Sequence, residues 1–148
     1  TRLVLLRESK EYDNTVVVRK LSYLADAIVQ AAVDYARRHL EPTYGTPLRA
    51  DLERSRFCVL ALGKLGGAEL NYSSDIDLIF LYEQDGQTDA RRIVSNQEYF
   101  ERLSKEIIRL LTEPTDLGVE IHGEAEPGKM RGDVLGHLLA SQRAEKTH

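Results

Sequence analysis

The chain has 148 residues, of which 42% are hydrophobic and 30% are charged, values typical of one globular domain with its own core. Its net charge is −4 and its pI is near 5.6, which argues against nucleic acid or an anionic membrane as a partner. No apolar run is long enough to span a membrane, and the single cysteine, Cys58, excludes an internal disulfide. We therefore expect a cytoplasmic protein with no disulfide framework.

Residues 1–50 are expected to form a leading helical segment. Apolar residues recur at intervals of three and four between about Thr15 and His39, which predicts an amphipathic helix packed on the core. The apolar positions of this pattern are Val17, Leu21, Leu24, Ile28, Ala31 or Ala32, and Tyr35. Pro42 follows as a stop signal, and a loop is expected from Glu41 to Asp51 because it also contains a glycine and a second proline.

Two strands separated by a glycine-rich turn are predicted next, inside a catalytic core expected over residues 56–122. Phe57 to Leu62 is an apolar run rich in strand formers, and Asp75 to Tyr82 is a second such run. The glycines that end the first run are Gly63, Gly66 and Gly67. Asp75 and Asp77 are two residues apart, so in a strand both carboxylates leave the same face.

Two adjacent carboxylates repel each other, and a divalent cation would neutralise both. Mg²⁺ prefers this kind of ligand together with phosphate oxygens, and the backbone amides of Gly66 and Gly67 can approach a phosphate closely. Each feature alone has a more ordinary explanation, a solvated strand edge or a plain turn, but their order and spacing favour a metal and phosphate site. Three arginines before the first strand either approach the phosphate or form an ordinary solvated surface: Arg49, Arg54 and Arg56.

The string GKLGGAELNYSSDIDLIFLY carries a family resemblance. Its Gly-Gly pair, seven-residue spacer and Asp-apolar-Asp strand are similar to the DNA polymerase β-like nucleotidyltransferase signature. The whole string resembles the catalytic motif of bacterial glutamine synthetase adenylyltransferases. The resemblance implies an α+β fold, a small mixed sheet flanked by helices, with Mg²⁺ on Asp75 and Asp77. It also implies binding of an ATP or AMP nucleotide by Gly66, Gly67, Ser74 and Lys64.

The resemblance further implies Mg²⁺-dependent transfer of an adenylyl group to a tyrosine of glutamine synthetase, or phosphorolytic removal of AMP from it. Family members are large enzymes with two such domains, so this chain would be one partial domain, more similar to the AMP-removing copy. A nitrogen-signalling regulator protein is the expected partner of the full-length enzyme, besides glutamine synthetase itself. The alternative is a nucleotide-binding or regulatory module without turnover. A polynucleotide-modifying transferase shares the signature but is disfavoured by the acidic charge.

A second helix is predicted after a polar loop at Glu83–Ala90. Ser95 and Glu98 form a capping-box pattern just before an apolar period that ends near Pro114. The period consists of Tyr99 or Phe100, Leu103, Ile107, and Leu110 or Leu111.

The family pattern, followed here from about Leu21 to Gly118, would continue with a third strand bearing another carboxylate. In register, Glu124 takes the place of that aspartate, and His122 and Glu126 take the places of two arginines. The third carboxylate is therefore Glu124, the nearby Glu120, or absent. Residues 123–148 read as a divergent tail, with a short helix expected within 130–145.

Overall fold

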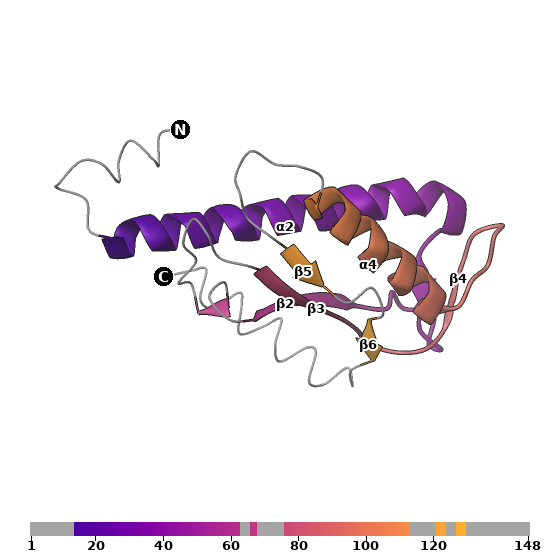
Figure 1. Ribbon diagram of the computed structural model, residues 1–148. Helices are drawn as coiled ribbons and strands as arrows, with labels where there is room; N and C mark the ends of the chain where they lie inside the picture. Colours follow the sequence, from indigo (N-terminus) through magenta and orange to yellow (C-terminus); the bar gives the residue numbers. More distant parts are fainter. Residues whose placement is uncertain (1–13, 63–65, 68–75, 113–120, 124–126, 130–148) are drawn as a thin grey trace.

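The structure, a computed structural model, describes residues 14–62, 66–67, 76–112, 121–123 and 127–129 (Figure 1). In chain order its elements are α2 (Asn14–Tyr44), β1 (Pro47–Leu48), β2 (Phe57–Leu62), β3 (Ile76–Tyr82), β4 (Gln87–Thr88), α4 (Asn96–Thr112), β5 (Ile121–Gly123) and β6 (Gly128–Lys129). The helix expected within 130–145 falls outside the described residues.

The central strand of the main sheet is β3. It pairs antiparallel with β2, from Phe57 opposite Tyr82 to Leu62 opposite Asp77. On its other edge it pairs in parallel with β5 and then with β6. Two consecutive parallel strands need a crossover connection, and α4 lies in the connection between β3 and β5. The α+β architecture with a small mixed sheet is thus confirmed.

Both helices pack on the same face of this sheet (Figure 1). Along β3, Leu81 is buried on the face away from the helices. On the helix side the alternate residues Ile76, Leu78, Phe80 and Tyr82 are all buried, as the two-residue period of a strand requires. These side chains share one core cluster with the helices, in which Phe100 of α4 stacks on Phe57 at 5.3 Å and on Tyr82 at 5.1 Å between ring centroids. Cys58 is buried, and burial raises the pKa of its thiol.

The second helix follows the sequence prediction closely. Ser95 Oγ accepts a hydrogen bond from the Glu98 backbone amide at 3.1 Å, which is half of the capping box. The Glu98 carboxylate accepts hydrogen bonds from Arg102 one turn later. The buried apolar side chains of α4 are Tyr99, Phe100, Leu103, Ile107 and Leu111.

The first helix is longer than predicted and buries a different face. It continues through Pro42 to Tyr44, because a proline so close to the end removes only one intrahelical hydrogen bond. Gly45 then ends it with φ of 72°, and its amide donates to the Glu41 carbonyl at 2.8 Å. The loop expected from Glu41 is therefore shorter, and it contains the strand β1. This strand pairs with β4, which lies in the loop expected at Glu83–Ala90, and the two form a separate two-stranded sheet.

The predicted core positions of α2 are partly wrong. Leu24, Ile28 and Tyr35 are 41%, 37% and 50% exposed. Val17 and Ala32 are buried as predicted. The rest of the core face is made largely of smaller residues than those predicted: Ala25, Val33, Ala36 and Leu40. Small side chains let the helix lie close to α4 and the sheet. They are therefore the ones buried, while the larger Leu24, Ile28 and Tyr35, about a third of a turn away, face solvent.

The described helices include none that is both long and apolar enough to cross a membrane. The expected cytoplasmic location stays a prediction.

Candidate functional site

Asp77 lies at one end of the β2–β3 pair, on the face of the sheet that the helices leave open. It is the first residue of β3 that pairs with β2, opposite Leu62, and it is exposed. Its neighbours Ile76 and Leu78 point to the opposite, buried face. An aspartate on an open face keeps its hydration, so no cation is needed to offset burial of its charge. The carboxylate is instead accessible to a ligand.

Gly66 lies beside the end of β2. A Cβ built on Gly66 would stand 2.5 Å from the backbone oxygen of Ala61, far inside any contact distance. Close approach of the turn to the strand therefore requires glycine at this position, whether or not a phosphate binds there. Gly67 follows it and is exposed. The structure thus brings the predicted Gly66 and Asp77 to the same end of the β2–β3 pair.

Other predicted site residues cannot be placed in this way. Lys64, Ser74 and Asp75 lie outside the described residues, as do both candidates for the third carboxylate, Glu120 and Glu124, and also Glu126. Within the described ranges, no group of three or more His, Cys, Asp or Glu side chains is arranged to hold a metal ion.

Two short strands pair with the other edge of β3, where a third strand was expected. The backbone of β5 runs parallel to β3 with His122 opposite Asp77. Gly123 is the last residue of β5, and Pro127 directly precedes β6, which pairs with the same edge of β3. Residues 124–126, between the two strands, lie outside the described residues.

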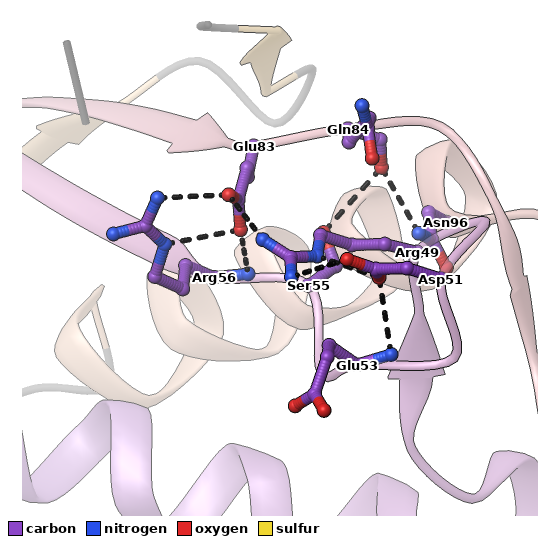
Figure 2. A network of polar contacts seen from close by, with 8 residues as sticks. All are labelled: Arg49, Asp51, Glu53, Ser55, Arg56, Glu83, Gln84 and Asn96. Carbon is purple, nitrogen blue, oxygen red and sulfur yellow. Dashed lines mark hydrogen bonds and ion pairs between the residues drawn. The ribbon is translucent and has the colours of Figure 1, made fainter. Parts of the chain in front are cut away.

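The opposite end of the β2–β3 pair is closed by an ion-pair network (Figure 2). Glu83, directly after β3, is buried at 6% exposure and accepts hydrogen bonds from Arg49 Nη1 at 2.8 Å and from Arg56 Nε and Nη2 at 3.0 and 2.8 Å. The Arg56 backbone amide donates to the same carboxylate at 3.1 Å. These contacts, led by Arg56, lower the pKa of Glu83 to about 2.

This network answers the question left open for two of the three arginines. Arg49 and Arg56 neither face a phosphate nor form a plain solvated surface, because they bind Glu83. Arg49 also pairs with Asp51 at 2.7 Å. The sequence signal was available: an acid directly after one apolar strand and an arginine directly before its antiparallel neighbour. We therefore assign Glu83 a structural role, some distance from Asp77.

Asn96 joins the same region to α4 and was not foreseen. It is fully buried, and its Nδ2 donates to the Leu48 and Gln84 carbonyls at 2.9 and 3.0 Å. Its backbone amide donates to the Gly86 carbonyl at 2.9 Å. The side chain thereby ties the start of α4 to β1 and to the residues after β3, so it supports the fold and not the candidate site.

Comparison with known proteins places these elements in context. A family model described as glutamate-ammonia ligase adenylyltransferase matches residues 5–121. A protein of Aromatoleum aromaticum, named bifunctional glutamine synthetase adenylyltransferase/adenylyl-removing enzyme, is 41% identical over 96% of this chain. Proteins of the same name from Chromobacterium violaceum and Neisseria meningitidis serogroup A are 41% and 43% identical over 87% and 70% of it.

The matched region is a small part of each of these relatives. It covers 16%, 15% and 12% of their respective lengths. The activities in their names belong to polypeptides about six to eight times longer than the matched segment.

Proposed function

Because the chain belongs to the glutamate-ammonia ligase adenylyltransferase family, we propose that it acts in Mg²⁺-dependent adenylyl transfer to, or AMP removal from, a tyrosine of glutamine synthetase. Glutamate-ammonia ligase is another name for glutamine synthetase, and the relatives' names include both directions of the reaction. The observation that carries the proposal is the family match across residues 5–121, which includes the whole β2–β3 unit and its exposed Asp77.

In this proposal Asp75 and Asp77 hold the ion. Mg²⁺ prefers hard oxygen ligands such as a carboxylate, and the Asp77 carboxylate is exposed. When bound, Mg²⁺ would neutralise phosphate charge. The close approach of Gly66 to the end of β2 supports a backbone surface for the nucleotide phosphates beside Asp77. Lys64 and Ser74 would add one charge and one hydroxyl donor.

The chemistry proposed is substitution at the α-phosphorus of the nucleotide. In adenylylation the tyrosine oxygen bonds to that phosphorus and pyrophosphate leaves. In the reverse direction inorganic phosphate attacks the tyrosyl-AMP phosphorus, the tyrosine oxygen leaves, and ADP is formed. In this proposal Glu120 or Glu124 would accept the proton of the attacking tyrosine.

A second candidate function is a nucleotide-binding or regulatory module without turnover. The observation that favours it is on β5, where the residue opposite Asp77 is His122 and none of the three described residues is acidic. In both candidates glutamine synthetase is the partner, and a nitrogen-signalling regulator would act on the longer polypeptide.

The test is incubation of the chain with adenylylated glutamine synthetase, phosphate and Mg²⁺, with ADP release as the readout. We expect Asp77→Asn to lower the rate by about a hundredfold or more, since loss of one charged group in a phosphoryl-transfer site has effects of this order. Glu53→Gln is the matched control, because Glu53 is an exposed carboxylate near the opposite end of β2.

Three outcomes are informative. ADP release that depends on Asp77 and not on Glu53 supports the enzyme. Nucleotide binding that depends on Asp77 without ADP release supports the module. Equal nucleotide affinity and equal turnover in wild type and Asp77→Asn would contradict both proposals for this site.

A further inference from the structure

Asp77 has a cross-strand neighbour of a residue type that binds metal ions. The strands β2, β3 and β5 lie side by side in Figure 1, and Asp77 is paired with Leu62 on one side and with His122 on the other. Leu62 has no ligand atom in its side chain, and neither has Ile79, two residues further along β3. Among these described neighbours, His122 is therefore the one that could share a metal ion with Asp77.

The register places His122 on the same face of the sheet as Asp77. Residues paired on neighbouring strands lie about 5 Å apart and belong to the same face. The preceding pair joins Ile121 to the buried Ile76, on the face that the helices cover, and α4 contacts β5. Because the faces alternate along a strand, the pair of His122 and Asp77 belongs to the other face, where Asp77 is exposed.

An aspartate and a histidine at neighbouring positions are a different ligand set from carboxylates alone. Mg²⁺ binds oxygen ligands and keeps several waters, whereas an imidazole nitrogen is a usual ligand of transition-metal ions. Mn²⁺ takes the carboxylate and water ligands that suit Mg²⁺ and, as a transition-metal ion, also binds nitrogen. One imidazole added to the carboxylate of Asp77 therefore favours Mn²⁺ over Mg²⁺.

We propose that His122 is a ligand of the ion held by Asp77, and that this ligand makes the site bind Mn²⁺ in preference to Mg²⁺. The inference rests on the proposed function, in which Asp77 holds the ion. The histidine contributes one nitrogen, the aspartate contributes oxygen, and water or nucleotide oxygens take the remaining positions. His122 thereby determines which metal the site accepts.

The test is titration of the chain with Mn²⁺ at constant pH, measured by the loss of the free-ion EPR signal, and then competition with Mg²⁺. We expect His122→Leu to lower the Mn²⁺ affinity by about tenfold or more and to change the Mg²⁺ affinity by less than about twofold, since loss of even an outer-shell partner of a metal ligand costs about tenfold. Asp77→Asn should weaken the binding of both ions. His39→Leu is the matched control, because His39 is an exposed histidine on α2.

Pulsed EPR of the bound Mn²⁺ distinguishes direct ligation from an indirect effect of the substitution. A coordinated imidazole gives a hyperfine coupling from its nitrogen, which should be present in the wild type and in His39→Leu and absent in His122→Leu. His122→Asp replaces the nitrogen ligand with oxygen and should raise the Mg²⁺ affinity relative to the Mn²⁺ affinity. Circular dichroism checks that each variant is folded, and the measurement on the wild type needs no variant.

The outcomes separate this inference from the proposed function. Equal affinity for both ions in wild type and Asp77→Asn, or no Mn²⁺ bound by the wild type, would contradict the metal site itself. Weaker binding of both ions by Asp77→Asn, without nitrogen coupling in the wild type, would overturn the role of His122 and leave the Asp77 site intact. An unchanged ratio of Mn²⁺ to Mg²⁺ affinity in His122→Leu would have the same consequence.

Discussion

Two acidic residues at opposite ends of the β2–β3 pair have opposite environments. Glu83 is buried and bound by two arginines, whereas Asp77 is exposed on the open face of the sheet. A buried carboxylate must be paired to remain charged, while an exposed one keeps its hydration. The first is therefore suited to holding the strands together and the second to meeting a ligand.

We expect Glu83→Gln to lower the free energy of unfolding at neutral pH by about 1–2 kcal/mol, after allowing for solvent screening of the partly exposed arginines. The folded-state pKa of Glu83 is about 2, below its ordinary value of 4.5. Its contribution is therefore fully present above pH 4.5 and is lost as the pH falls toward about 2. Urea unfolding across this range should show the two curves of free energy against pH converging in acid.

Glu53→Gln serves as the control for this experiment, because it removes an exposed carboxylate from the loop between β1 and β2 that carries Arg49 and Arg56. Its curve should follow that of the wild type throughout. A constant difference between wild type and Glu83→Gln down to the acid limit would contradict the ionic role of Glu83.

Gly66 allows a test that separates folding from ligand binding. Gly66→Ala should destabilise the chain by about 1–3 kcal/mol, because the added methyl meets the Ala61 carbonyl oxygen. Gly86→Ala introduces the same kind of clash, with the Leu48 oxygen, near the other end of β3. Both should lower the urea midpoint, but only Gly66→Ala should also weaken nucleotide binding under conditions where each variant is folded. Equal nucleotide affinity in the two variants would leave Gly66 a purely structural glycine.

At the scale of elements, the local signals were sufficient for β2, β3 and α4. Their boundaries follow from an apolar run, a two-residue period and a serine cap, all of which act within a few residues. The buried face of α2 was not predictable in the same way. Its sequence has two apolar stripes, and the choice between them depends on how closely α4 and the sheet approach, which is a property of the packed molecule.

Short elements were missed for a related reason. The two-residue strands β1 and β4 pair across 39 or more positions of sequence, and such pairing leaves no local pattern. The Glu83 network was missed because it joins residues on either side of the strands. For the candidate site, the motif predicted that Gly66 and Asp77 lie close together. It did not predict that the Asp77 carboxylate is exposed. That follows only from which face of the sheet the helices cover.

At the scale of the whole molecule, the helices cover one face of the sheet, and the candidate site depends on the other face. The helices bury Ile76, Leu78, Phe80 and Tyr82. Asp77, Ile79 and Leu81 alternate with them on the other face, where Asp77 and Ile79 are exposed and Leu81 is buried. In the proposed function the open face receives the nucleotide. Packing against the helices on the covered face fixes the position of β3.

Adjacent substitutions in β3 test this asymmetry directly. Leu78 is 3% exposed and Ile79 is 39% exposed, so Leu78→Ala should cost about 2–4 kcal/mol of unfolding free energy and Ile79→Ala less than about 1 kcal/mol. Urea unfolding with equal m-values would show that both variants unfold from the same compact state. If Ile79→Ala cost as much as Leu78→Ala, the face that carries Asp77 would itself be buried in solution, and substrate would need another approach to the carboxylate.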